Sequence, residues 1–292
     1  MPELPDLDVV ADALHASLAD RPVVEARAPM PLSLRGTPSQ LAALVGQRVV
    51  RIARSGKFLD IALSVDGLVI NPMLTGRFQL AAHGEKAPAG VAVALRLGAR
   101  SAGPPPDAAA WTTDAAWLPA AGAGVWLRYR DPTQMGKVYL LPAGLGYAVP
   151  GRGAGEQGPD AMDPALTLEV WRERIRRHPG EVKNLLRNQA FIAGIGNAYA
   201  DEILFAARIA PFRKRSTLAA EEVDTLYEAM REVLADSIDV LRRRVPPAFE
   251  KQVRDQLSVH GKGDGPCPRC GGRLTQVRAG GFPTGYCRAC QR

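Results

Sequence analysis

The first half of the chain begins with helically spaced apolar residues and continues with short apolar runs. Leu7, Val10, Leu14 and Leu18 are spaced for one face of a helix, which predicts an amphipathic helix over residues 5–19. The runs that follow are bounded by turn residues, a pattern typical of a β-sandwich or barrel. The predicted strands are 47–53, 58–64, 67–71, 91–97, 125–130 and 137–142.

The pattern becomes helical in the second half of the chain. Residues 99–124 are rich in Ala, Pro and Gly and predict a long, exposed and mobile loop. Residues 149–160 are rich in Gly and Pro and predict a linker at a domain boundary. Beyond them, Leu226, Met230 and Ile238 share one face of a long helix. The predicted helices are 164–177, 180–190, 198–207 and 219–244.

Composition indicates a globular chain with a basic surface. The 292 residues, 46% of them hydrophobic, suit two domains with their own cores. A net charge of +7 points to an acidic partner such as nucleic acid, although an Arg-rich proteome gives the same balance. No apolar run reaches the roughly 18 residues of a membrane span, and the start of the chain lacks the regions of an export signal. We therefore expect a cytoplasmic protein, nucleoid-associated if bacterial, that is not secreted and has no membrane partner.

All four cysteines lie in a Gly-rich tail that is too short to fold without a cross-link or a bound metal. Cys267 and Cys270 form one Cys-x2-Cys pair, and Cys287 and Cys290 form another sixteen residues later. Two such pairs joined by a hairpin are typical of a closed structural Zn2+ site with one ion per chain. Four unpaired thiols are the alternative. The tail carries basic residues that fit either a DNA-contacting or a solvated hairpin: Lys262, Arg269, Arg273, Arg278, Arg288 and Arg292.

A glycine turn precedes the predicted helix at residue 198. Gly194 and Gly196 allow a tight turn, and Asn197 is suited to cap the next helix. The N–H groups at that helix start then form an anion site, which Lys183 on the preceding helix can reach. An ordinary helix–turn–helix with a good cap fits the same residues.

The extreme N-terminus offers a second kind of chemistry. Removal of Met1 would leave Pro2 with a free secondary amine, which has a pKa near neutrality and can form an iminium with an aldehyde-like carbon. The neighbouring Glu3 carboxylate can move the protons that this reaction requires. The same residues also fit a plain helix start with Pro5 at the first helical position.

Taken together, these motifs resemble the formamidopyrimidine-DNA glycosylase / endonuclease VIII family of base-excision repair enzymes. The resemblance runs over nearly the whole chain, and the motifs occur in the family's order. They are Pro2-Glu3-Leu4-Pro5, Ser55-Gly56-Lys57, Thr75-Gly76, Gly158-Pro159-Asp160-Ala161, Lys183 with Gly194 to Glu202, and the four-cysteine tail ending at Gln291.

The resemblance implies an α+β multi-domain fold. Its N-terminal part, residues 1–148, would be a helix followed by a two-sheet β-sandwich that carries catalysis. A linker over 149–163 would lead to a helix–two-turns–helix DNA-binding domain over 164–260. Residues 261–292 would form the four-cysteine zinc-finger hairpin.

The resemblance also implies residue roles. Pro2 would attack C1′ of a damaged nucleotide, Glu3 would transfer protons, and Lys57 would assist near the sugar-phosphate. Lys57 also fits a strand-end lysine in solvent. Lys183 and Asn197 would hold phosphates beside a nucleotide flipped out of the stack. Lys262 is a further expected DNA contact.

Several positions depart from the family pattern. Asp6 stands where the formamidopyrimidine branch usually has Glu. In the loops that probe the duplex, Leu74 aligns with the usual Met, Thr133 with an Arg that reads the orphan base, and Met135 with a Phe wedge. Apolar wedging by Leu74 and Met135 remains available, whereas guanidinium readout of the opposite base does not.

The C-terminal part departs as well. Phe282 occupies the place of an Arg that binds phosphate and helps the later elimination, and Arg278 substitutes only if the hairpin shifts. Segment 238–257 is shorter than the Gly/Thr-rich stretch that caps 8-oxoguanine in typical members. These departures weaken the case for 8-oxoguanine and leave the iminium chemistry intact.

The leading hypothesis is a monomeric bifunctional DNA glycosylase and abasic-site lyase that acts on an oxidised or otherwise damaged base without a nucleotide cofactor. Two alternatives remain. One is a protein of the same fold that binds abasic or distorted DNA without turnover. The other is a zinc-ribbon module fused to an unrelated β-domain.

Overall fold

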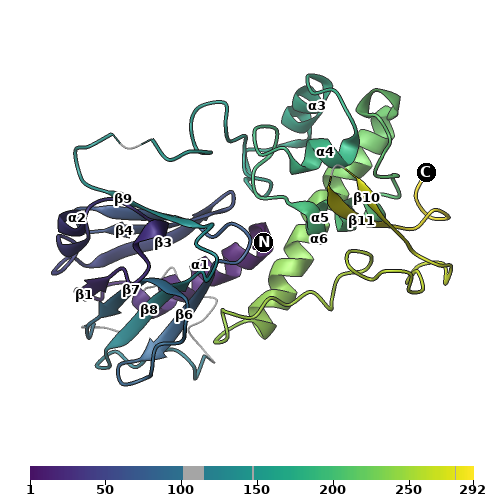
Figure 1. Cartoon of the computed structure of the whole chain (residues 1–292). Helices are drawn as coiled ribbons and strands as arrows, with labels where there is room; N and C mark the ends of the chain where they lie inside the picture. The colour runs from purple at the N-terminus through teal and green to yellow at the C-terminus, as the bar shows by residue number, and fades with distance from the viewer. Residues whose placement is uncertain (101–114, 147, 280) are drawn as a thin grey trace. The chain divides into compact units, whose positions relative to one another are not determined.

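Two compact units make up the chain in a computed structural model that describes residues 1–100, 115–146, 148–279 and 281–292 (Figure 1). The first unit comprises Met1–Pro2, Asp6–Val149 and Leu241–Gln252. The second comprises Glu3–Pro5, Pro150–Val240 and Val253–Arg292. The units are thus built from interleaved chain segments, and the four-part division drawn from the sequence stays a prediction.

Two sheets form the body of the first unit, and Figure 1 shows them as two layers. One has the strand order β1-β7-β8-β6 and the other β2-β9-β5-β4-β3. Pairing is antiparallel except between β2 and β9. The strands are β1 (Val23–Arg27), β2 (Leu34–Arg35), β3 (Val49–Ser55), β4 (Phe58–Leu63), β5 (Gly67–Asn71), β6 (Arg77–Ala82), β7 (Val91–Leu97), β8 (Val125–Arg130) and β9 (Lys137–Leu141).

Helix α1 (Leu4–Leu18) supplies much of the apolar core of the first unit. Its residues Leu7, Leu14 and Leu18 are at most 1% exposed, so the predicted apolar stripe is the buried face. A short helix, α2 (Pro38–Ala42), begins at a Thr37 capping box. These helices and sheets confirm the predicted N-terminal helix and β-rich domain of an α+β protein.

The described end of the predicted loop over 99–124 is anchored to the core, whereas residues 101–114 lie outside the described residues. The guanidinium of Arg21, which is fully buried, donates to the carbonyl oxygens of Ala120 at 2.8 Å and Ala123 at 2.5 Å. A buried charge of this kind is tolerated when its donors are satisfied. The stretch just before β8 is therefore a fixed part of the first unit.

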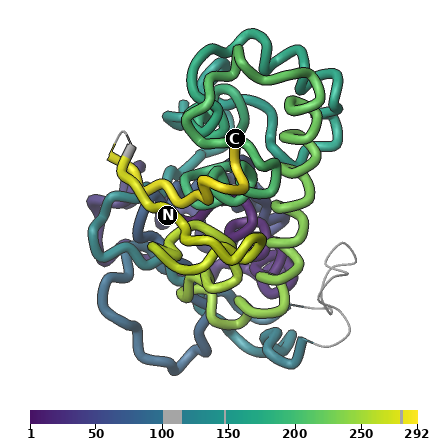
Figure 2. Tube along the Cα trace, turned by 90° about the vertical axis from the view of Figure 1, so that its right-hand side faces the viewer, coloured from purple at the N-terminus to yellow at the C-terminus, as the bar shows by residue number. Residues whose placement is uncertain are grey.

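Helices dominate the second unit and confirm the predicted helical domain. They are α3 (Leu168–Arg176), α4 (Val182–Arg187), α5 (Asn197–Ala206) and α6 (Ala220–Arg244). Figure 2 shows α6 as one long, continuous helix, and its last residues from Leu241 are counted with the first unit. The buried residues Leu226, Met230 and Leu234 lie on the apolar face that the spacing predicts.

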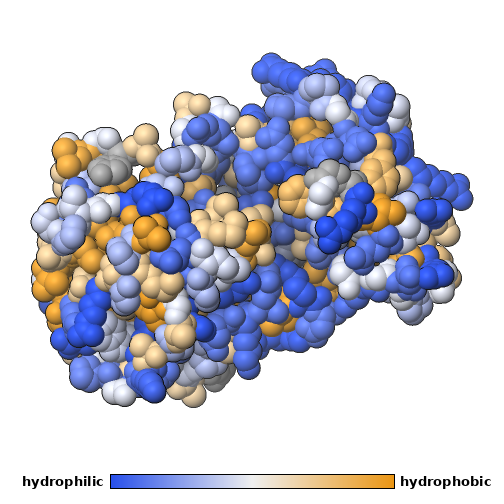
Figure 3. Space-filling model, viewed as in Figure 1, coloured by the Kyte–Doolittle hydropathy of each residue, from blue (hydrophilic) through white to orange (hydrophobic). Residues whose placement is uncertain are grey.

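A two-stranded hairpin completes the second unit. It consists of β10 (Thr275–Ala279) and β11 (Phe282–Tyr286), paired antiparallel between the two cysteine pairs. Hydrophilic side chains cover most of the face of the second unit that Figure 3 presents. Among the described residues, no helix combines the length and the apolar character that crossing a membrane requires.

Candidate functional site

Pro2 lines a pocket that lies wholly within the first unit. It is buried and is followed along the pocket wall by Asp6 and by apolar residues of α1. The segment after α6 closes the pocket, because Gln252 donates to the Met1 carbonyl oxygen at 3.2 Å and accepts from Arg77 at 3.0 Å. The full lining is Pro2, Asp6, Leu7, Val10, Gly76, Arg77, Phe78, Val245, Phe249, Lys251 and Gln252.

Glu3, the next residue along the chain, is held by the start of α5 in the second unit. Its carboxylate is 3% exposed and accepts the backbone N–H groups of Gly196 at 2.8 Å, Ala198 at 2.9 Å and Tyr199 at 3.2 Å. These groups and the helix dipole favour a negative charge at this place. The sequence predicted an anion site for a phosphate at this helix start, whereas the anion that these N–H groups bind is the carboxylate of Glu3.

The two glycines of the turn are required by this contact. A side chain at Gly196 would overlap the Glu3 carboxyl group, and one at Gly194 would come within 2.7 Å of Leu4, whose N–H donates to the Gly194 carbonyl oxygen at 3.0 Å. Gly194 also has a φ of +100°, which other residues rarely adopt. We name Gly194, Gly196 and the start of α5 the Glu3 socket.

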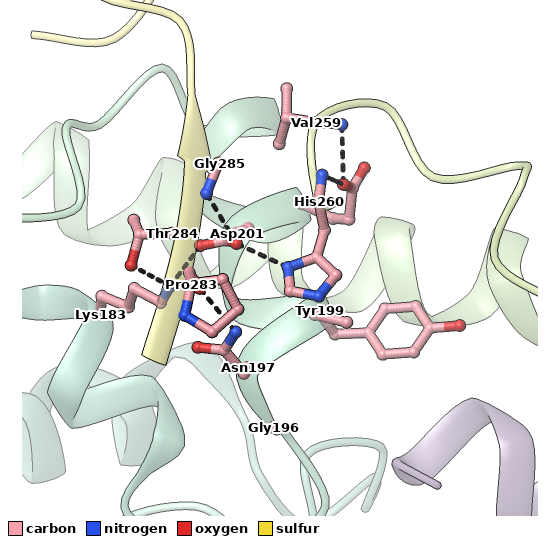
Figure 4. Close-up of polar contacts among 12 residues, drawn as sticks. Lys183, Gly196, Asn197, Tyr199, Asp201, Val259, His260, Pro283, Thr284 and Gly285 are labelled. Atoms are coloured by element: carbon pink, nitrogen blue, oxygen red, sulfur yellow. Dashed lines mark hydrogen bonds and ion pairs between the residues drawn. The ribbon is translucent and has the colours of Figure 1, made fainter. Parts of the chain in front are cut away.

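The predicted capping role of Asn197 is wrong. Gly196 is the N-cap of α5, and Asn197 is the first helical residue, with no side-chain capping bond. Its Nδ2 instead donates to the Pro283 carbonyl oxygen of β11 at 2.7 Å (Figure 4). The Asn197 side chain does not cap α5 because Glu3 already accepts from the N–H groups that a cap would bind.

Lys183 of α4 forms a buried ion pair with Asp201 of α5, as Figure 4 shows. The Lys183 Nζ lies 2.6 Å from Asp201 Oδ1 and also donates to Thr284 Oγ1 at 2.6 Å and to the Pro283 carbonyl oxygen at 3.2 Å. Burial lowers the pKa of Lys183, and the Asp201 carboxylate opposes that shift. Lys183 and Asn197 therefore meet at Pro283, so two of the predicted phosphate ligands lie together at the hairpin.

Asp201 joins further parts of the second unit. Its Oδ2 accepts the Gly285 N–H at 3.0 Å and lies 2.7 Å from His260 Nδ1. The next residue, Glu202, accepts the backbone N–H groups of Val259 and His260. The first turns of α5 thus bind the N-terminus, the hairpin and the segment before the cysteines through one run of residues.

The two duplex-probing loops expected from the sequence are fastened to each other in the first unit. Thr75 Oγ1 lies 2.5 Å from Asp131 Oδ1 and 2.6 Å from Thr133 Oγ1. Leu74 and Met135 project beside this junction and are 48% and 44% exposed. Thr133 therefore ties the loops together where the family's arginine is expected, and two apolar side chains are left in solvent.

Lys57 and Lys262 are half-buried and lie in turns. Lys57 follows Gly56 in the two-residue turn between β3 and β4, where Gly56 has a φ of +57°. Lys262 Nζ donates to the Asp255 carbonyl oxygen at 2.8 Å, just before the first cysteine pair. Their predicted roles stay predictions.

The four cysteines form one cluster whose sulfur atoms all lie within 4.8 Å of one another. Cys267 and Cys290 are 3.9 Å apart, and Cys270 and Cys287 are 3.7 Å apart. Zinc–sulfur bonds of about 2.3 Å in a tetrahedron place the sulfur atoms about 3.8 Å apart. The cluster can therefore hold a metal ion with a closed set of thiolate ligands.

Family models and relatives agree with this architecture. Residues 1–138 match the model described as the formamidopyrimidine-DNA glycosylase N-terminal domain, and residues 157–245 match the formamidopyrimidine-DNA glycosylase H2TH domain. The formamidopyrimidine-DNA glycosylase of Heliobacterium modesticaldum is 31% identical over 300 residues and covers 100% of both chains. That of Thermomicrobium roseum is 33% identical over 301 residues, with 100% of this chain and 99% of the relative covered.

Solved structures show the same fold. A complex of wild-type Lactococcus lactis Fpg (MutM) with DNA containing N7-benzyl-Fapy-dG aligns with a TM-score of 0.82 at 22% identity, covering 100% of both chains. The Lactococcus lactis Fpg complex with DNA containing an abasic site aligns with a TM-score of 0.80 at 21% identity over 99% of both chains. An N-terminal helix, β-sheets, a helical domain and a four-cysteine hairpin thus define the class of DNA-repair glycosylases. The chain belongs to the formamidopyrimidine-DNA glycosylase family, whose members combine base removal with abasic-site lyase activity.

Sequence reasoning missed three features of the site. The Glu3 socket joins two motifs that are each visible in the sequence, Pro2-Glu3 and the glycine turn, but no spacing rule pairs them. Asp201 is one of several acids near the turn, and nothing in its spacing distinguishes it. The return of Leu241–Gln252 to the first unit has no local sequence pattern.

Proposed function

We propose that the chain excises a damaged, oxidised base from DNA and then nicks the strand, with the amine of Pro2 as nucleophile after removal of Met1. The observation that carries this proposal is the position of Glu3. Its buried carboxylate is fixed by three backbone N–H groups and is one peptide bond from Pro2. A structural acid in a plain helix start needs neither the glycine socket nor a place next to a proline amine.

The Pro2 nitrogen bonds to C1′ of the damaged nucleotide as the C1′–base bond breaks, and the base leaves with a proton. Loss of the ring oxygen from C1′ opens the sugar and gives an iminium, with Glu3 moving the protons of these steps. Removal of a C2′ proton then expels the 3′ phosphate, and water releases the sugar fragment and restores Pro2. Lys57 is assigned to electrostatic assistance near the sugar-phosphate.

The other predicted residues serve DNA binding in this proposal. Leu74 and Met135 are exposed apolar side chains on tied loops, which suits them to fill the gap left by a flipped nucleotide. Lys183, Asn197 and Lys262 are assigned to the phosphates. Glycosylase neighbours whose structures contain abasic-site or damaged-base DNA support DNA as the partner. The expected location remains the cytoplasm, where the DNA of a bacterial cell lies.

The cysteine cluster is assigned one structural Zn2+, which would supply folding energy rather than catalysis. Removing the ion with a chelator is expected to unfold the hairpin, because structural zinc contributes about 10–16 kcal/mol of apparent binding energy in zinc-finger peptides. Affinity for an abasic-site duplex, measured by fluorescence anisotropy, should fall more than about tenfold and return when Zn2+ is added back. Affinity that survives complete removal of the metal would contradict the assignment.

The proposal is tested by borohydride trapping on a duplex with a single abasic site, using protein whose Met1 removal is verified by mass. Borohydride reduces an iminium to a stable amine, so the native protein should give a covalent protein–DNA adduct. Pro2→Ala loses the ring but keeps a terminal amine that borohydride can also trap, so this variant alone does not identify the nucleophile. Proteolytic mapping of the native adduct must therefore place the DNA on residue 2. No adduct together with tight binding would show a lesion-binding protein without the lyase chemistry.

A further inference from the structure

An arginine of α4 lies on the outer end of the hairpin. The guanidinium carbon of Arg187 is 3.8 Å from the ring centroid of Phe282, the first residue of β11. Phe282 is 46% exposed, and Arg187 is half-buried. The ring thus covers one face of the guanidinium and restricts its motion, while its N–H edge stays accessible.

The N–H donors of Arg187 are unused. Among the described residues, the side chain makes no hydrogen bond and no ion pair, in contrast to Arg174 and Arg213 of the same unit, which donate to carbonyl or carboxylate oxygens. Arg187 is only half-buried, so its donors are hydrated and can exchange that water for the oxygens of an incoming acceptor. The guanidinium of Arg187 is therefore held in place by Phe282 with its N–H donors available to a ligand.

The neighbouring acidic side chains are already engaged, which leaves Arg187 available to an external anion. Lys183, one helical turn earlier on α4, is occupied by Asp201 and Thr284. Glu3 and Asp201 act electrostatically on Arg187, but the Glu3 carboxylate is bound by the socket and Asp201 by Lys183, Gly285 and His260. No described acidic side chain is left to neutralise Arg187.

We propose that Arg187, stacked on Phe282, binds a backbone phosphate of the DNA and supplies from α4 the guanidinium that is missing at position 282 of the hairpin. The inference rests on the proposed function, since it names a further contact with the same substrate. A planar guanidinium binds phosphate oxygens in a bidentate manner that an ammonium does not reproduce. The stacking with Arg187 also gives a role to Phe282, which by its position in the sequence is only the loss of an arginine.

The first test measures affinity for a duplex carrying a tetrahydrofuran abasic analogue as salt is varied. Arg187→Ala is expected to weaken binding about tenfold and to lower the salt slope by about one, the change for one phosphate contact in duplex DNA. Arg187→Lys should recover the slope but only part of the affinity. The matched control is Arg278→Ala, an exposed arginine on the other hairpin strand, which should change neither quantity by as much.

Two further variants separate stacking from charge. Phe282→Ala keeps the charge and should retain the salt slope while weakening binding about threefold. The double variant R187M/F282R moves the guanidinium from the helix to the hairpin, and it should bind more tightly than R187M alone with the slope restored. Unchanged affinity and slope in Arg187→Ala, or an equal loss in Arg278→Ala, would overturn the inference.

Borohydride trapping separates this inference from the proposed function. At saturating protein, Arg187→Ala should still give the covalent adduct, because the residue acts on binding and not on the Pro2 amine. Wild-type protein that gives no adduct would refute the proposed chemistry whatever Arg187 does. The melting temperature of each variant, expected to match that of the native protein, checks that the hairpin is folded.

Discussion

Glu3→Gln is expected to lower the rate of base excision about a thousandfold, within the range of roughly 10²–10⁴ for loss of a general acid or base. The amide cannot exchange the protons. Its NH2 group would also replace one oxygen of the carboxylate and so face either the N–H of Ala198 or those of Gly196 and Tyr199. Single-turnover release of a damaged base from a duplex oligonucleotide measures the effect.

A duplex with a preformed abasic site, which has no nucleobase to release, provides the internal control. On a duplex with a preformed abasic site no base must leave, so Glu3→Gln should still be trapped by borohydride, although more slowly. Glu228→Gln, an exposed carboxylate on α6, should leave both rates unchanged. Base excision at the native rate in Glu3→Gln would remove Glu3 from the mechanism.

Asp201→Asn is expected to destabilise the second unit by about 3–5 kcal/mol, because it leaves the buried Lys183 ammonium without a counter-charge. Asparagine keeps the shape of the side chain, so the loss reports charge rather than packing. Denaturant unfolding of the zinc-loaded protein measures it.

Two comparisons make this result decisive. Asp264→Asn removes an ion pair with Arg273 whose partners are both mostly exposed, and it should change the free energy of unfolding by less than about 1 kcal/mol. Adding Lys183→Met to Asp201→Asn should recover part of the stability, since the unpaired charge is then gone. Equal effects of Asp201→Asn and Asp264→Asn would contradict the role of the buried pair.

Local sequence patterns predicted most of the elements. The apolar stripes of α1 and α6 are long enough for the helical period to be unambiguous, and both helices lie within about one residue of the prediction. β1, β2, β6 and the short helix α2 were missed. Val24 and Glu25 of β1 are partly exposed, and β6 follows a turn so closely that its alternation is short.

The site was predicted less completely because its contacts join distant parts of the chain. Pro2, Glu3 and the cysteine pairs carry their chemistry in their residue types and spacing. The Glu3 socket depends on residues 193 positions further along the chain, and no spacing rule relates them. The capping role of Asn197 was predicted wrongly for the same reason, since a capping residue is recognised locally while the competing carboxylate comes from a distant part of the chain.

The guanidinium on Phe282 illustrates the same limit. When positions are compared one at a time, Phe282 is simply a missing arginine of the hairpin, and Arg187 is one of many arginines in the chain. Their 3.8 Å contact relates a helix to a strand that lies 95 positions later. A sequence comparison made residue by residue cannot detect such an exchange of roles between two elements.

The membership of Glu3–Pro5 in the second unit makes these residues an intramolecular peptide ligand. Because the tripeptide is covalently attached, its effective concentration at the socket is high, so it stays in place even if its intrinsic affinity is low. A fragment that starts at Pro150 would present the same N–H groups without their carboxylate and would be open to acidic peptides added in solution. In the proposed chemistry, the nucleophile Pro2 thus belongs to the first unit and the proton carrier Glu3 to the second.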